Sequence, residues 1–532
     1  MLILPHNRLT SLASSGFVRA WLSAVHRLVF CWRGWSSYHW TAAAIVLLAL
    51  VLRLWNLSDS AQFLGDQGRD ALVVSRIFRH ADPVFIGPVT SVGNMYLGPG
   101  YYYFMAPFLW LTWPNPVGPI YAVALLGVLA VWLTYYWGKK LVGQPAALVA
   151  AGLMSVSHVA LEFARFSWNP NPAPLASLVM LYFTYRAWRH HPKYWLVVAA
   201  AFSVLIQLHY MTLLSLGGAG LIWIAQLVGR YRSGRPLRPV VLPALGGVAL
   251  VVLTMVPLAL FDLRHDFLNA RAFANILVGG ETLGSQSAGG LVELWRVIRE
   301  THGRSMHILF EITVGQIRTL NTLLVGVTLA VVGWLIARRQ HYRHQHGLLV
   351  LAAYLLTGIG GTAAYQHTIF NHYIAYLFPI TFLTLGVVLT KLWQWHLFAK
   401  AAAAGWLIFF LAFNVPRWPL QDAGWKISDI ERTARTIYER VGPVEKYNLV
   451  LLSGTGDIDA QNYRYFLEAT DRPPVRDEQR GQVETLFIIN EDRQLNRVVD
   501  SPIYEIVVFP DKAPAEVYNV PGGPQITVLT TR

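Results

Sequence analysis

The sequence predicts a polytopic α-helical membrane protein that ends in a small extracytoplasmic α/β domain. Of its 532 residues, 54% are hydrophobic and only 14% are charged, whereas an average soluble protein carries about 25% charged residues. The apolar residues form runs near the length of about 20 residues that crosses a bilayer. This composition excludes a cytosolic globular protein and a disordered chain. The single cysteine, Cys31, excludes a disulfide scaffold.

Eleven apolar segments are predicted to cross the membrane as helices. The third and fourth segments are short, so they are the weakest candidates for a full crossing. The segments are 38–57, 117–138, 145–161, 173–188, 194–210, 212–229, 239–261, 312–336, 347–365, 372–390 and 398–415.

The charges between these segments predict an orientation. Residues 1–416 hold 29 Lys and Arg and 11 Asp and Glu. With the N-terminal arm 1–37 in the cytoplasm, 18 of the basic residues and no acid fall on that side. Loops rich in Lys and Arg stay cytoplasmic. The long loops at about 58–116 and 262–311, and the C-terminus, are therefore expected outside. The basic excess then needs no nucleic-acid partner.

The C-terminal stretch 417–532 is predicted to form the α/β domain. Residues 427–441 have a helical pattern, and four runs read as strands: 448–453, 485–490, 504–509 and 525–530. A Gly-x-Gly pattern at Gly454 follows the first strand, but it lacks the third glycine of a nucleotide-binding turn. An accessory or acceptor-recognition role is expected for this domain.

The first outer loop carries the strongest candidates for chemistry. Asp66 and Asp70 lie four residues apart with Arg69 between them, so a helix would place both carboxylates on one face. One interpretation is a helix start whose acids lie near the positive end of the dipole. The other is a reactive carboxylate beside the bilayer. An aromatic stretch, from Leu97 to Trp113, follows and suits the headgroup level.

This order of parts resembles the GT-C superfamily of membrane glycosyltransferases, of the protein O-mannosyltransferase and aminoarabinose-transferase type with an RgtA/B/C/D-like domain. Such enzymes move a sugar from a polyprenyl-phosphate carrier to an acceptor outside the membrane. The resemblance implies that Asp66 is catalytic and that Arg69 binds the donor phosphate. Gln67 stands where the family has a second acid, and Leu97-Gly98-Pro99 lacks the family's lysine.

Further candidates follow from the same resemblance. Arg165, His209, His372 and Tyr373 are expected to bind the donor's phosphate or sugar, and Asp70 is second in rank. Each has a plainer interpretation as a headgroup-level or packing residue. The loop at 262–311 has a plain interpretation as a solvated connector. The remaining second-rank candidates are Glu162, Asn169, Arg264 and His265.

The predicted function is an inverting glycosyltransferase of the cell envelope. Its partners are a polyprenyl-phosphate-linked sugar, an extracytoplasmic acceptor and membrane lipid, with no nucleic acid. No metal ligands are assigned; no cofactor is firmly implied, and a divalent cation, Mg²⁺ or Mn²⁺, is left open. The alternatives are a polysaccharide ligase or polymerase, and a polytopic transporter or flippase. The predicted location is a bacterial cell membrane.

Overall fold

The computed structural model describes residues 36–531 apart from a few short gaps. Most of the arm predicted at 1–37, with Cys31, lies outside this range. The gaps are 91–94, 279–290, 339–342, 366–367, 444, 477–478, 493–497 and 499.

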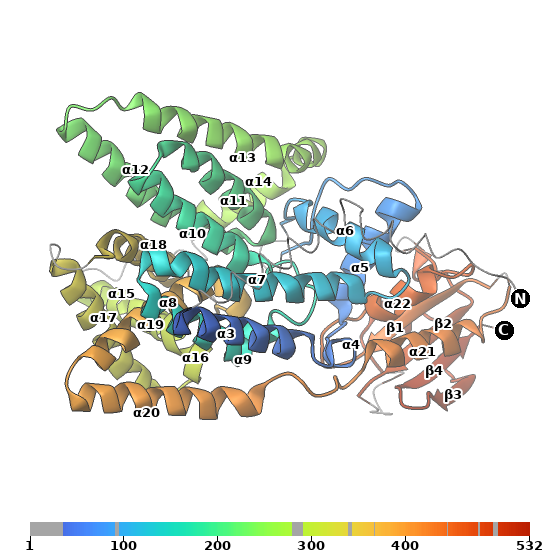
Figure 1. Ribbon diagram of the computed structural model, residues 1–532. Helices are drawn as coiled ribbons and strands as arrows, with labels where there is room; N and C mark the ends of the chain where they lie inside the picture. The colour runs from blue at the N-terminus through green and yellow to red at the C-terminus, as the bar shows by residue number, and fades with distance from the viewer. Residues whose placement is uncertain are drawn as a thin grey trace, which may run out of the picture.

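The membrane part is a helical bundle, and it confirms a polytopic helical fold (Figure 1). Each of the eleven predicted apolar segments overlaps a helix, but only eight helices in the described chain are long and apolar enough to cross a membrane. Five of them are α3 (Ser37–Leu54), α7 (Val117–Leu141), α13 (Arg238–Arg264), α17 (Arg318–Ala337) and α18 (Gln345–Ala364). The other three, α12 (Leu214–Arg232), α19 (Phe378–Gln394) and α20 (Leu397–Asn414), are extended by adjoining 3-10 turns to Tyr210–Arg232, Asn371–Gln394 and Leu397–Arg417.

Three of the predicted segments form shorter helices: α8 (Gln144–Val156), α10 (Ala173–Arg189) and α11 (Trp195–Leu208). Helix α19 lies at the centre of the bundle, since 94% of the most apolar stretch of its span, Asn371–Gln394, is buried. A helix that is apolar on every side suits such a position. Gly386 on α19 allows α8 to come close, because a Cβ there would lie 2.2 Å from the carbonyl oxygen of Ala146.

The predicted outer loops are largely helical rather than extended. The first contains α4 (Leu57–Ser60), α5 (Gly65–Arg79) and α6 (Gly100–Thr112). The later one contains α14 (Leu268–Val278) and α15 (Leu291–Met306). In Figure 1, α5 lies between the bundle and the C-terminal sheet. The first loop is therefore a folded layer that links the two parts.

The C-terminal unit is a four-stranded sheet with strand order β1-β2-β4-β3. Strands β1 (Tyr447–Leu452) and β2 (Thr485–Asn490) are parallel, with Tyr447 opposite Thr485, and β4 (Gln525–Thr530) is antiparallel to β2. Short β3 (Glu516–Asn519) forms the edge.

Two helices accompany this sheet, α21 (Ile427–Tyr438) and α22 (Gln461–Glu468). The sequence pattern predicts α21 but not α22. The strand predicted at 504–509 is wrong: this segment contains the short helix α23 (Tyr504–Val507). The spacing explains the error, because Ile506 and Phe509 lie three residues apart and both enter the small core cluster behind the sheet.

Helix α22 packs directly on α5, which joins the C-terminal unit to the first outer loop. A Cβ on Gly68 would lie 2.4 Å from the backbone nitrogen of Asn462, so only glycine permits this approach. The Asn462 amide donates to the carbonyl of Phe63 at 3.2 Å. Arg76 on α5 forms an ion pair with Glu468 at 2.8 Å. The sheet unit is thereby held beside Asp66.

Candidate functional site

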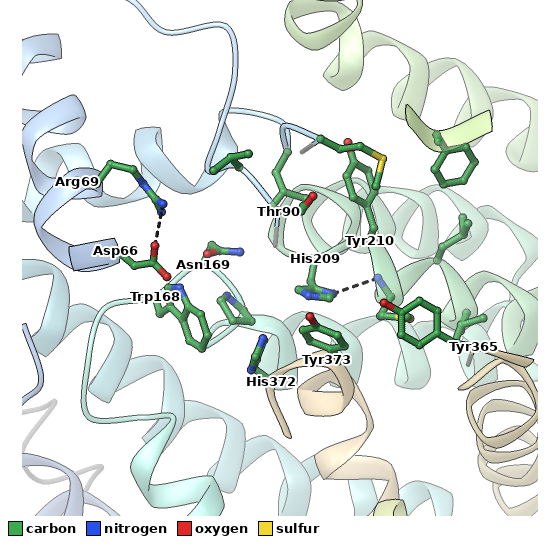
Figure 2. A pocket seen from close by; sticks show the side chains of 18 residues that line it. Asp66, Arg69, Thr90, Trp168, Asn169, His209, Tyr210, Tyr365, His372 and Tyr373 are labelled. Carbon is green, nitrogen blue, oxygen red and sulfur yellow. Dashed lines mark hydrogen bonds and ion pairs between the residues drawn. The ribbon is translucent and has the colours of Figure 1, made fainter. Parts of the chain in front are cut away.

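A cavity of about 450 Å³ opens beside the start of α5 (Figure 2). It takes one wall from the first outer loop and the others from segments that begin or end helices α10 to α12 and α19. Its lining includes seven residues with charged, amide, imidazole or aromatic side chains that could contact a ligand: Asp66, Arg69, Trp168, Asn169, His209, His372 and Tyr373. Six of these seven were candidates from the sequence, and Trp168 was not.

The two carboxylates of α5 differ sharply in environment. Arg69 binds both, with its Nη1 2.7 Å from Asp66 Oδ1 and its Nη2 2.8 Å from Asp70 Oδ1. The Asp66 side chain is 47% exposed, whereas that of Asp70 is fully buried. Tyr102 donates a further hydrogen bond to Asp70 at 3.1 Å. Asp66 thus faces the cavity, and Asp70 holds Arg69 in place.

The charge states at this ion pair follow from burial and proximity. Burial raises the pKa of Asp70 above its usual value, although the ion pair and hydrogen bond with Arg69 oppose the rise. Burial also works against the charge on Arg69, but Asp70, Tyr102 and Asp66 keep its pKa raised. Arg69 therefore remains cationic at the cavity wall.

Aromatic and imidazole rings form a further part of the wall, which in Figure 2 runs from Trp168, beside Asp66, to His372, Tyr373 and His209. The rings of His209 and Tyr373 lie 4.7 Å apart, and those of Trp168 and His372 lie 4.5 Å apart, measured between centroids. The backbone N–H of Met211 donates to His209 Nδ1 at 3.1 Å. The neutral imidazole then carries its proton on Nε2, which is free to donate to an oxygen.

Asn169 also lines this cavity. Its amide donates to the carbonyl of Leu208 at 2.6 Å, which ties the loop before α10 to the end of α11. The side chain therefore fixes these two segments relative to each other as well as lining the cavity.

Arg165 does not line this cavity. It is only 2% exposed and donates to the carbonyls of Leu52 at 2.6 Å and Trp55 at 2.7 Å, and to the hydroxyl of Ser60. Burial lowers the pKa of Arg165 to about 10, so it stays charged at neutral pH. The carbonyls at the end of α3 lack donors within their own helix, and Arg165 supplies them.

Three further candidates also lie away from this cavity. His265 stacks on Phe261 with ring centroids 4.0 Å apart, and Arg264 is exposed beside it. Neither residue lines a described cavity. Glu162 lies at the end of the short helix α9 (His158–Glu162) and lines a second cavity instead.

The second cavity, of about 490 Å³, adjoins the first. The two share Asp66, Arg69 and Trp168. Its far wall comes from the C-terminal unit, through residues between Thr455 and Gln461. No residue of this segment was a candidate from the sequence, where the incomplete glycine pattern at Gly454 is the one local signal. Asp66 lies where the two cavities meet.

No metal centre is visible in the described part of the chain. Within those residues, no group of three or more His, Cys, Asp and Glu side chains is arranged to hold a metal ion. Gln67 also turns its amide oxygen to the backbone N–H of Leu64 at 2.8 Å, so it does not complete a carboxylate pair with Asp66.

Comparison with known proteins identifies the fold of this chain. Residues 97–261 match the family model for dolichyl-phosphate-mannose-protein mannosyltransferases. No curated protein sequence matches the chain. The structure is similar to ArnT from Cupriavidus metallidurans bound to undecaprenyl phosphate, with 13% identity, a TM-score of 0.56, and 93% of this chain and 98% of that chain covered. The apo form of the same enzyme gives 14% identity, a TM-score of 0.53 and the same coverage. The chain is therefore an integral membrane protein with the GT-C fold that its sequence motifs predict.

Proposed function

We propose that this protein transfers a sugar from a polyprenyl-phosphate carrier to an acceptor outside the membrane, with inversion at the anomeric carbon. The observation that carries the proposal is the position of Asp66 at the junction of two cavities. One cavity can hold the sugar phosphate of the donor, and the other can hold the acceptor. The similar ArnT structure has undecaprenyl phosphate bound, which supports a donor of this class.

Asp66 is suited to act as general base. Arg69 occupies its Oδ1, and among the described residues no donor is bonded to its Oδ2. Oδ2 can therefore take the proton of an acceptor hydroxyl while the new bond to the anomeric carbon forms. The bond from that carbon to the phosphate oxygen breaks with its electron pair. Attack from the side opposite the phosphate inverts the configuration.

The leaving phosphate needs positive charge or hydrogen-bond donors where its negative charge develops. Arg69 is a cation at the cavity wall, and His209 presents an Nε2–H to the same cavity. The rings of His372 and Tyr373 line the apolar part, where the sugar and the start of the lipid chain would lie. Donor binding and base catalysis thus share Arg69.

The charge pattern supports a location and an orientation. Eighteen basic residues and no acid fall on one side of the predicted membrane segments, which favours the cytoplasm for that side. The N-terminus then lies in the cytoplasm, and Asp66 and the C-terminal unit lie outside, in the cell membrane of a bacterium. An acceptor of the cell envelope would reach Asp66 from this side.

The Asp66→Asn variant tests the proposal. The full-length protein is reconstituted in liposomes with labelled polyprenyl-phosphate sugars, and label is followed into envelope glycan, lipid and protein. We expect transfer to fall by about 10²–10⁴-fold, the usual contribution of a positioned base. Asp59→Asn is the matched control, since Asp59 lies on the same outer layer but lines neither cavity. Near-wild-type turnover by Asp66→Asn would overturn the role of Asp66.

A further inference from the structure

The second cavity, here called the outer cavity, is built from two parts of the chain that are far apart in sequence. One wall holds Asp66 and Trp168, and the other holds Thr455 and Asp457 of the C-terminal unit. Its volume of about 490 Å³ is in the range of small-molecule sites. The C-terminal unit is therefore part of the site.

Glu162 also lines the outer cavity, and its carboxylate has no partner among the described residues. It is partly buried, and in the described structure its carboxylate makes no hydrogen bond or ion pair. A half-buried carboxylate without a donor is costly unless a ligand or water supplies one. Burial raises the pKa of Glu162. The side chain thus has room for new hydrogen bonds inside the outer cavity.

The rest of the lining combines aromatic rings with amides. Phe163, Phe166 and Trp168 present apolar surface, and Gln62 and Gln461 add amide groups. Flat rings next to carboxylates and amides complement a sugar, whose ring has apolar C–H faces and a rim of hydroxyls. This mixture does not resemble the apolar wall of the first cavity.

The charge of the outer cavity opposes an anionic ligand. Its lining includes four carboxylates, those of Asp66, Glu162, Asp457 and Asp459. Asp459 is paired with Arg480, which is not a lining residue, whereas Glu162 and Asp457 form no ion pair among the described residues. Arg69 is the one cation among the lining residues that the structure describes, and in the proposed function it already serves the donor phosphate in the first cavity. A phosphate here would meet like charges at short range, which is unfavourable.

Resting on the proposed function, we infer that the outer cavity binds the acceptor, and that this acceptor presents a phosphate-free neutral or amino sugar to Asp66. Glu162 and the segment 455–461 select it. Glu162 accepts a hydrogen bond from an acceptor hydroxyl or amine, and Trp168 contacts the sugar face. The C-terminal unit is then a specificity element, held against α5 by the packing of α22.

Protection of an introduced thiol tests this inference without relying on transfer. The C31S background removes the only cysteine, and T455C places one thiol at the rim of the outer cavity. Its alkylation by a maleimide is followed in the full-length reconstituted protein with maltotriose, chitosan trisaccharide or maltotriose phosphate added. We expect maltotriose or the chitosan trisaccharide to slow labelling at concentrations at least tenfold lower than those at which maltotriose phosphate does so. T531C, outside both cavities, should show no protection.

Equal or better protection by the phosphorylated sugar, or by a Ser/Thr peptide, would overturn the inference, as would no protection by any trisaccharide. Glu162→Gln should raise the half-protecting concentration at least fivefold, and the exposed control Glu439→Gln should not. An unchanged value in Glu162→Gln would also count against it. Consumption of the polyprenyl-phosphate sugar by the same protein is measured separately. Loss of protection with donor consumption intact refutes only the acceptor site, whereas absence of donor consumption refutes the proposed function.

Discussion

Replacing Arg69 by Gln should destabilise the protein far more than replacing Arg76, although both arginines lie on α5 and both form ion pairs near 2.8 Å. Arg69 neutralises the fully buried Asp70, whereas Arg76 and its partner Glu468 keep 45% and 22% of their side chains exposed. Breaking a buried ion pair by removing one partner costs about 3–5 kcal/mol. An exposed pair contributes about 0–1 kcal/mol.

We expect a loss near the lower end, about 3 kcal/mol, because Tyr102 still donates to Asp70 in the variant. This corresponds to roughly a hundredfold change in the unfolding equilibrium, since about 1.4 kcal/mol is a factor of ten. Arg76→Gln should lose no more than about 1 kcal/mol. Equilibrium unfolding in mixed micelles, followed by intrinsic fluorescence, measures both values.

The pH dependence gives a second check with a defined sign. The pKa of Asp70 is raised above 3.8 in the folded protein, so the folded state binds this proton more tightly than the unfolded state does. The contribution of Asp70 to stability therefore falls as pH rises through the raised pKa. Without Arg69 the pKa rises further. The deficit of Arg69→Gln should accordingly be smaller at pH 5 than at pH 8.

Two results would refute this reasoning. One is an Arg69→Gln deficit that matches that of Arg76→Gln. The other is a deficit that stays constant, or grows, as pH falls from 8 to 5. Either would mean that Asp70 is not an uncompensated charge once Arg69 is gone.

Two further predictions concern other parts of the site. Gly68→Ala should push α22 away from α5, because its Cβ would lie 2.4 Å from the Asn462 nitrogen; limited proteolysis should release the C-terminal unit faster than in Gly326→Ala, where no atom lies within 4 Å. His209→Phe keeps a ring in the wall but removes the Nε2–H, so it should raise the KM for the donor about tenfold, the effect of about one hydrogen bond to a charged group. An unchanged KM would remove His209 from the phosphate site.

The helical part could be read from the sequence because apolar runs have a direct physical cause in the bilayer. Each predicted segment from 38–57 to 398–415 contains or overlaps a helix. Apolar length alone does not account for segment 145–161, because the helix α8 that overlaps it has only 13 residues. The packing of α8 against α19 depends on small side chains rather than on length. Edge strand β3 went unpredicted because it is mostly exposed and lacks an alternating apolar pattern.

The candidate site likewise contains residues that the sequence could predict and one that it could not. His209, His372 and Tyr373 could be found because each lies at an end of a predicted span, and such ends gather at one level of the membrane. Asp66 could be found because it forms an acidic pair with Asp70 in the loop that follows the first span. Arg165 could not be placed in this way. Its partners are backbone carbonyls at the end of α3, and a sequence does not reveal which carbonyls lack a donor.

The outer cavity depends on contacts between residues nearly 400 positions apart, yet two glycines beside Asp66 indicate these contacts in the sequence. Gly65 is the first residue of α5, and Gly68 lies three residues later inside the helix, where a glycine costs about 1 kcal/mol relative to alanine. A Cβ on Gly65 would lie 2.5 Å from Asp457, and one on Gly68 would lie 2.4 Å from Asn462. Both glycines thus mark the helix face that meets the C-terminal unit. Asp66 and Arg69, which are also three residues apart, occupy the adjoining face. The approach of the C-terminal unit and the orientation of the ion pair toward the cavities therefore follow from the same three-residue spacing.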